Sequence, residues 1–362
     1  MFFFHEVNRG EFFTIMNATL KRIFVFGFPG MYGGAATEMH HQIILWLDMG
    51  VEVHLIPAWN PQCEELLPVM EERGVIIHEP LEWGAMRSED AIFGFCSELY
   101  LSYLPEIRHY TRRTVFINCM TCVFGEEKRA MRDGEVALFL FQNEEVRSDL
   151  QPQLQAINPD PTIRFMSFRP YFHEEEFPFH SERNRDVFCC GHISRSDRDK
   201  YARETLAIYE GVRSPLPKKG IFLGFGALVE EKTGKPPSWI RTARNHYELP
   251  VTDFYQECDV VLQPSDLTEN WPRVGLEAMA SGSVLIVDNR GGWKQMVEHE
   301  KTGWLCDSVK DFIKYASLMA KEPELCMEMA KAARERGRLL AGKETGRKSW
   351  EAVFEEVTRL KT

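Results

Sequence analysis

Short apolar segments alternate with segments of helical character along almost the whole chain. In the first half we expect strands at 22–27, 51–56, 75–78, 91–96, 114–118, 136–141 and 163–167. Expected helices between them lie at 35–49, 61–73, 97–110 and 144–156. Short apolar strands that lack polar alternation and are separated by helices are typical of a parallel sheet covered on both faces. The first half therefore predicts a doubly wound, Rossmann-like α/β domain.

A second series of the same kind begins near residue 187. Its expected strands are 187–191, 221–223, 260–263, 283–287 and 304–306, and its expected helices lie near 199–211, 253–257, 309–321, 324–340 and 345–360. The charged, aromatic segment 168–185 is rich in residues that break helices and strands, which indicates a linker. At 362 residues the chain is long enough for two domains. We predict Rossmann-like domains at 1–170 and 186–342, a linker at 171–185 and a last helix at 343–362.

Composition narrows the class of protein. Hydrophobic residues make up 44% of the chain and aromatic residues 12%, which is typical of a globular protein. The net charge of -11 disfavours nonspecific binding to nucleic acid. Nine cysteines, an odd number, without a recognisable signal peptide indicate a reducing compartment, so we expect a cytoplasmic protein. We find no stretch of about 18 apolar residues that would span a membrane. The aromatic N-terminus leaves open an extra strand, a loose arm, or a surface that contacts a membrane or a partner.

The segment 263–292 contains two glutamates eight positions apart, Glu269 and Glu277. We expect Glu269 in a polar loop after a strand and Glu277 inside a short helix. Pro272 suits the first position of this helix, and Gly282 suits the residue just past its end. Amides at a helix start bind phosphate, and carboxylates accept hydrogen bonds from vicinal hydroxyls. A ligand that has phosphate between two groups with vicinal hydroxyls would suit these residues, and a sugar nucleotide is such a ligand.

This segment resembles the donor-site signature of retaining GT-B glycosyltransferases of the group 1, or family 4, class. In that family the two glutamates are followed by a small-residue helix end, an apolar strand and a Gly-Gly loop, and here these are 278–282, 283–287 and 291–292. The resemblance implies two Rossmann-like domains that face a cleft, with a C-terminal helix that crosses back to the first domain. It also implies that Glu269 contacts the donor sugar and Glu277 the ribose. The donor-binding residues expected beside them are Asn270, Trp271, Pro272 and Arg273.

A glycine-rich loop follows the first expected strand and includes Gly33 and Gly34. A strand, a glycine-rich loop and a helix in this order form the layout of a phosphate cradle. In the resembled family this loop carries Gly-Gly and lies against the donor diphosphate or the acceptor. A tight turn between strand and helix is the alternative. The loop does not read G-x-G-x-x-G, so it gives little support to nicotinamide binding.

Basic residues follow the first strand of the second series. A diphosphate leaving group needs cations, which Arg and Lys usually supply. The resembled family has Gly-Arg at this strand end and a lysine several residues later, but here His192 stands at that position. Arg195 and Lys200 are the expected pair, while Arg198 or His192 could take the arginine's role. The alternative is a solvated basic loop that binds no ligand.

Three residues are candidates for the acceptor side of the cleft. Many members of the resembled family carry a histidine near the strand end at 118, where this chain has Asn118 and Thr121. His40 on the first expected helix could face the cleft, although a core or surface histidine is the more common case. Cys119 and Cys122 form C-x-x-C, which leaves open buried thiols, a redox pair or a zinc site.

Together these features predict a glycosyltransferase that moves a sugar from a nucleotide diphosphate-sugar to an acceptor with retention of configuration. Arg195, Lys200 and Glu269 would carry the reaction, and no metal or other cofactor would be required. The D-x-D triplet at 197–199 is better explained by helix capping than by metal binding. The expected acceptor is a carbohydrate, a lipid-linked compound or another hydroxyl compound. A sugar-nucleotide epimerase of the same fold and a non-catalytic nucleotide-sugar-binding subunit remain as alternatives.

Overall fold

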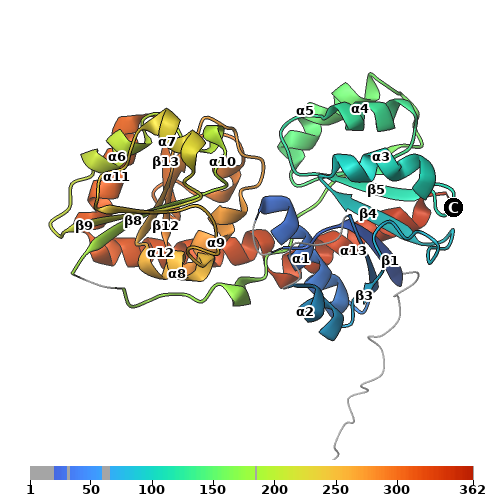
Figure 1. The fold of residues 1–362 in the computed structure, drawn as a ribbon, viewed down its shortest axis with the longest axis horizontal. Coiled ribbons are helices and arrows are strands. Elements are labelled where there is room, and N and C mark those ends of the chain that lie inside the picture. Colours follow the sequence, from blue (N-terminus) through green and yellow to red (C-terminus); the bar gives the residue numbers. More distant parts are fainter. Residues whose placement is uncertain (1–19, 31–32, 59–65, 184–185, 362) are drawn as a thin grey trace, which may run out of the picture.

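The computed structural model describes residues 20–30, 33–58, 66–183 and 186–361. The aromatic N-terminus at 1–19, part of the glycine-rich loop at 31–32, the beginning of the helix expected at 61–73 and residues 184–185 of the expected linker lie outside the described residues. Two α/β units lie side by side, and the last two helices run along one side of both (Figure 1).

The first unit is built on a seven-stranded parallel sheet in the order β3-β2-β1-β4-β5-β6-β7. Its strands are β1 (Arg22–Gly27), β2 (Glu52–Pro57), β3 (Ile76–Ile77), β4 (Ala91–Phe95), β5 (Arg113–Asn118), β6 (Leu138–Phe141) and β7 (Arg164–Ser167). Its helices are α1 (Gly34–Asp48), α2 (Leu66–Glu72), α3 (Glu98–Ile107), α4 (Gly125–Arg132) and α5 (Glu144–Gln155). Alternate residues of β1 enter separate cores on the two faces: Ile23 and Val25 on one, Phe24 and Phe26 on the other.

The second unit is built on a six-stranded parallel sheet in the order β10-β9-β8-β11-β12-β13. Its strands are β8 (Phe188–Ile193), β9 (Lys218–Leu223), β10 (Ile240–Ala243), β11 (Val260–Gln263), β12 (Val284–Asp288) and β13 (Gly303–Cys306). Its helices are η1 (Glu174–Glu176) in the linker, η2 (Arg198–Lys200), α6 (Thr205–Gly211), α7 (Ala227–Thr233), α8 (Val251–Glu257), α9 (Arg273–Ser281), α10 (Gly292–Met296), α11 (Val309–Lys321) and α12 (Pro323–Ala341). Both sheets are wound in two directions from a central strand, β1 or β8, as predicted.

The prediction of one helix near 199–211 is wrong in part. The segment forms the short 3-10 turn η2, then an extended residue, Tyr201, and then α6. Tyr201 interrupts the helix because its ring is fully buried against Phe222 and Phe225. The elements α4, α7, α10 and β10 were not predicted. These elements are short, and α4 is mostly polar, so they lack a clear apolar period.

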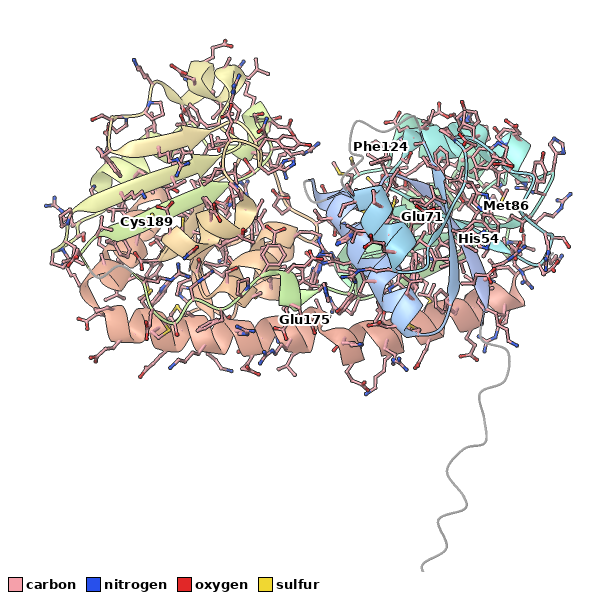
Figure 2. All side chains as sticks on the ribbon, turned by 60° about the horizontal axis from the view of Figure 1, so that its bottom comes forward. His54, Glu71, Met86, Phe124, Glu175 and Cys189 are labelled. Atoms are coloured by element: carbon pink, nitrogen blue, oxygen red, sulfur yellow. The ribbon has the colours of Figure 1, made fainter. Side chains whose placement is uncertain are left out.

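The C-terminal helix α13 (Lys343–Arg359) returns to the first unit, as the resemblance implied. Trp350 of α13 packs edge-on against Trp46 of α1, with ring centroids 4.7 Å apart, and donates its indole N–H to Gln42 at 2.7 Å. Glu175 marks the linker between the two units (Figure 2). The chain therefore crosses between the units twice, at the linker and at the junction of α12 with α13. The domain boundaries at 170, 185 and 342 stay a prediction.

Candidate functional site

The loop between β11 and α9 carries Glu269 and Asn270 and is held by close backbone contact with the Gly-Gly pair. The amide of Gly292 donates to the carbonyl of Glu269 at 2.7 Å. A Cβ atom added to Gly292 would lie 1.9 Å from the carbonyl oxygen of Asn270, and one on Gly291 would lie 2.5 Å from that of Glu269. Only residues without side chains permit this approach. The two glycines therefore fix the backbone on which Glu269 stands.

The structure brings two of the predicted catalytic residues together. Lys200 Nζ donates to Glu269 Oε1 at 2.6 Å, and each side chain keeps 19% of its surface exposed. Lys200 belongs to η2, which follows β8 along the chain. Glu269 follows β11, the strand beside β8 in the sheet. The pair thus lies at the carboxyl edge of the second sheet, where ligands bind in open α/β sheets.

The other basic candidates of this loop pair with other carboxylates. Arg195 forms an ion pair with Asp197 at 2.9 Å, and both side chains are at least half exposed. Arg198 lies 3.8 Å from Glu231, also at the surface. Of the predicted cations, Lys200 is therefore the one held against a predicted sugar-binding carboxylate.

His192 lies inside the second unit. It belongs to β8, has no exposed surface, and stacks on the ring of Tyr201 with centroids 3.9 Å apart. Burial lowers the pKa of His192 to about 3, so the imidazole is neutral at physiological pH. In this conformation the side chain is covered and offers no positive charge to a diphosphate.

Helix α9 has the predicted end but begins one residue later than predicted. Pro272 is the N-cap, with extended backbone angles, rather than the first helical residue. Gly282 closes the helix in the left-handed conformation, at φ 82° and ψ 24°. The preceding Trp271 is buried, and the guanidinium of Arg169 lies 5.3 Å from the centre of its ring.

Glu277 stands in the middle of α9 and is largely buried. The hydroxyl of Tyr255, on α8, donates to Glu277 Oε2 at 3.0 Å. Burial raises the pKa of the Glu277 carboxyl to about 7, while the charge of Arg273 and the Tyr255 hydrogen bond oppose this rise. Glu277 therefore changes charge close to neutral pH.

Asn270 joins the two units directly. Its amide nitrogen donates to Gln142 Oε1 at 2.9 Å and to the Met120 carbonyl at 3.2 Å. Its amide oxygen accepts from Asn143 at 2.5 Å. The partners follow β5 and β6, so the carboxyl edges of the two sheets meet at Asn270.

Arg273, the first residue of α9, is buried at the same junction. It donates to the carbonyl of Tyr171 at 3.3 Å and to Nδ1 of His41, and its guanidinium lies 5.2 Å from the ring centre of Phe172. The buried carboxylate of Glu38 acts on it from α1. Arg273, predicted to bind the donor, thus contacts the first unit and the linker.

Gly33 and Gly34 stand at the start of α1. Gly33 is the N-cap with φ 93°, a conformation that favours glycine, and Gly34 is the first helical residue. A Cβ atom on either glycine would touch no described atom within 4 Å. The neighbouring Met31 and Tyr32 lie outside the described residues.

Asn118 and Thr121 occupy one loop but differ in surroundings. Asn118 is buried and donates to the Cys122 carbonyl at 3.1 Å and to Glu127 Oε1 at 2.8 Å, so it shapes the loop. Thr121 is exposed on the loop that contacts Asn270 through the Met120 carbonyl. Thr121 is therefore the more accessible of the two acceptor-side candidates on this loop.

His40 is buried at the linker. Its Nε2 atom lies 2.8 Å from Glu176 Oε1, and Nε2 of His41 lies 3.2 Å from Glu176 Oε2. Among the residues that the structure describes, these three form a group compact enough to hold a metal ion.

Several residues of the junction were missed by the sequence analysis. Gln142 and Asn143 directly follow β6, and a polar pair after an apolar strand was a signal that could have found them. The carboxyl of Glu38 accepts a hydrogen bond from Gln142, and burial raises the pKa of Glu38 to about 7 although Arg273 and Gln142 oppose the rise. Tyr255 had no signal, since a tyrosine on a short helix is common.

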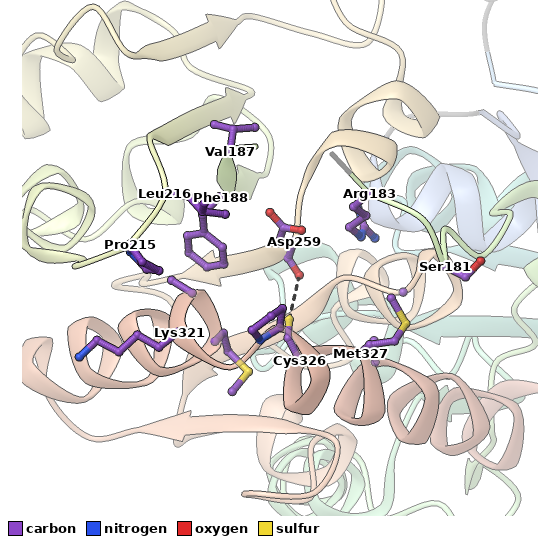
Figure 3. Close-up of a pocket in the computed structure, with 15 residues that line it drawn as sticks. Ser181, Arg183, Val187, Phe188, Pro215, Leu216, Asp259, Lys321, Cys326 and Met327 are labelled. Carbon is purple, nitrogen blue, oxygen red and sulfur yellow. Dashed lines mark hydrogen bonds between the residues drawn. The ribbon is translucent and has the colours of Figure 1, made fainter. Parts of the chain in front are cut away.

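A pocket of about 380 Å³ lies away from these residues. It is lined by Arg183, by Asp259 directly before β11, and by Cys326 and Met327 near the start of α12 (Figure 3). Asp259 marks the amino end of β11, opposite the end that leads to Glu269. This pocket is therefore separate from the candidate site.

A family model matches part of the second unit, and two curated relatives match part of the chain. Residues 246–336, which include both glutamates, match the family model described as glycosyl transferases group 1. Over 87 residues the chain is 34% identical to an uncharacterized glycosyltransferase of Haemophilus influenzae, and this match covers 23% of the chain and 24% of that protein. The match thus spans about a quarter of that relative's length.

Solved structures resemble almost the whole chain. Anabaena HepE in complex with UDP and glucose has a TM-score of 0.69 at 14% identity, covering 92% of this chain and 100% of that chain. TarM has a TM-score of 0.74 at 10% identity, covering 94% of this chain and 100% of that chain. At these identities the likeness concerns the fold, and it confirms the GT-B architecture of two Rossmann-like domains. None of the helices in the described ranges is long and apolar enough to cross a membrane.

Proposed function

We propose that this protein is a glycosyltransferase that uses a nucleoside diphosphate-sugar and retains the configuration at the transferred carbon. The observation that carries the proposal is the Lys200–Glu269 pair at the carboxyl edge of the second sheet. Glu269 lies inside the segment that matches the glycosyl transferases group 1 model. A cation and a carboxylate in contact are the two groups that a sugar diphosphate needs, one for phosphate and one for hydroxyls.

The donor would enter between these two side chains. Its diphosphate would take the ammonium of Lys200, and its sugar hydroxyls would donate to the released carboxylate of Glu269. The ribose would donate to Glu277, which presents a carboxylate on α9. UDP and glucose bound to the similar HepE structure are consistent with a ligand of this class.

The transfer would occur on one face of the sugar. The bond between the anomeric carbon and the phosphate oxygen breaks, the bond to the acceptor oxygen forms, and the departing phosphate oxygen takes the acceptor's proton. Lys200 would stabilise the negative charge that develops on the phosphate, and we expect Arg195, on the exposed part of the same loop, to assist it once the donor is bound. Protein cations would thus replace a metal ion. The hydroxyl acceptor would approach from the loop that carries Thr121, and we expect the reaction to take place in the cytoplasm.

The test is sugar transfer by Glu269→Gln, assayed with a panel of nucleotide sugars and hydroxyl acceptors. We expect turnover to fall by about two or more orders of magnitude, because a contact made to the reacting sugar is lost. The matched control is Asp266→Asn on the same loop, whose carboxylate pairs with Lys232 at 2.6 Å. Normal transfer by Glu269→Gln, or an equal loss in both variants, would refute the assignment. Conversion of the donor to an epimer without acceptor would favour the epimerase alternative.

A further inference from the structure

The guanidinium of Arg273 is held by groups from outside its own unit. His41, on α1 of the first unit, accepts a hydrogen bond from Arg273 through Nδ1, and Tyr171 accepts another through its carbonyl at 3.3 Å. Arg273 and His41 are both buried. Because a buried arginine without acceptors is costly, the position of Arg273 depends on His41.

Two donors point at the same nitrogen of His41. The backbone N–H of His173, in the linker, donates to His41 Nδ1 at 3.0 Å, in addition to Arg273. Nδ1 must therefore carry a lone pair, so the ring proton resides on Nε2. That proton is donated to Glu176 Oε2 at 3.2 Å. Glu176 thus selects the tautomer of His41 that can accept from Arg273.

This tautomer also excludes the simplest metal site. A metal bound to Nε2 of a neutral His41 would require the proton on Nδ1, where the N–H groups of Arg273 and His173 already point. The chain of contacts from Glu176 through His41 to Arg273 is therefore better explained as a hydrogen-bonded relay than as a metal site.

The relay ends on the helix that carries Glu277. Arg273 and Glu277 are four residues apart on α9, so their side chains lie on one face of the helix. Glu38 and His41 are three residues apart on α1 and share a face in the same way. The positive charge of Arg273 thus stands between one carboxylate of each unit.

We propose that His41, oriented by Glu176, is a positioning residue that fixes Arg273 and thereby keeps Glu277 ready to bind the donor ribose. This inference rests on the proposed function. The titratable and charged groups that face His41 are His40, His173, Glu176 and Arg273, and those that act on Glu277 are Arg273, Glu176 and Tyr255. Glu38 acts on Arg273 from α1. Burial and the charge of Arg273 lower the pKa of His41 to about 3, so the ring stays neutral above pH 5.

Loss of the relay should change the ionisation of Glu277. In His41→Leu the guanidinium of Arg273 loses an acceptor and is free to turn away from α9. Burial raises the pKa of Glu277 and Arg273 opposes that rise, so a displaced Arg273 lets the pKa rise further. Donor binding that needs the ionised carboxylate should then be lost at a higher pH than in the wild type.

The experiment is calorimetric titration with UDP-glucose between pH 5.5 and pH 8.5, with ADP-glucose and GDP-mannose as the other probes. Nucleotide sugars are suitable because they lack the terminal phosphate that titrates near pH 6. At pH 6.5 we expect His41→Leu to bind about tenfold more weakly than the wild type, with the difference shrinking as pH rises. His41→Asn should restore much of the affinity, since its amide oxygen can accept in place of Nδ1.

The matched control is His40→Leu, which removes a contact with the same Glu176 carboxylate but none with Arg273. Its pH profile should match that of the wild type. Equal profiles for His41→Leu and the wild type, or equal shifts in both histidine variants, would overturn the relay. A wild type that binds none of the three nucleotide sugars would refute the proposed function instead.

A second measurement tests, without any ligand, whether His41 holds Arg273 in place. Amide hydrogen exchange in the first turn of α9 should speed up in His41→Leu and stay unchanged in His40→Leu, because Arg273 anchors that turn. Unchanged exchange in His41→Leu would contradict the relay whatever the protein binds.

Discussion

Replacement of Lys200 by methionine separates the role of the lysine charge from the role of its aliphatic chain. Methionine keeps most of the apolar length of lysine but removes the ammonium that lies 2.6 Å from Glu269. A charge-assisted hydrogen bond to a diphosphate contributes about 1.5–3 kcal/mol. Lys200→Met should therefore weaken binding of UDP-glucose by about ten- to a hundredfold.

The same change should have a modest effect on stability. Each partner of the pair keeps 19% of its side-chain surface exposed, so water can reach part of the carboxylate that is left behind. We expect a loss of about 1 kcal/mol, which corresponds to a fall in Tm of about 2–4 °C for a domain of this size. Thermal unfolding followed by circular dichroism measures it.

The control for Lys200→Met is Lys232→Met. Lys232 donates to a carboxylate at the same distance, 2.6 Å, namely that of Asp266 on the same loop, and it also donates to the Arg198 carbonyl at 2.8 Å. It should cost comparable stability and leave the affinity for UDP-glucose unchanged. Equal affinity losses in the two variants would show that the loop, rather than the charge of Lys200, governs binding. No loss in Lys200→Met would refute the reasoning outright.

Three further outcomes are expected. Gly292→Ala should lower Tm and abolish sugar transfer, because its Cβ would lie 1.9 Å from the Asn270 carbonyl oxygen, and an unchanged Tm would contradict this close contact. Trp350→Ala should cost about 3–5 kcal/mol by opening a cavity between the last helix and the first unit, and denaturant unfolding measures the loss. The affinity for UDP-glucose should rise as pH increases through about 7, where Glu277 loses its proton and becomes a full acceptor. Tyr255→Phe removes a hydrogen bond that favours the ionised carboxylate of Glu277, so the rise in affinity should move to higher pH. If the affinity does not depend on pH in either the wild type or Tyr255→Phe, Glu277 is not part of the site.

Much of the fold followed from the alternation of apolar segments with helices. The strands predicted at 22–27 and 260–263 and the helix predicted at 309–321 coincide with β1, β11 and α11. The two strands are apolar runs that are buried on both faces, and α11 has buried residues at a helical period. The residues around Tyr201 do not indicate that it interrupts a helix, because its burial depends on Phe222 of strand β9.

The candidate site could be predicted only where its residues are close in sequence or follow a strand. Glu269 and Lys200 each follow a strand of the second sheet, and the adjacency of those strands brings them together. The contact of Arg273 with His41 joins residues 232 positions apart, and no local pattern indicates it. His192 took the place of an expected basic residue, yet its burial depends on a stacking partner that the sequence alone does not identify.

The most direct test is a crystal structure of the protein soaked with UDP-glucose. Our expectation is a diphosphate against Lys200, a ribose against Glu277, and a Lys200–Glu269 contact opened by the bound sugar. A nucleotide bound at the pocket lined by Arg183 and Asp259, with Lys200 still paired to Glu269, would contradict it.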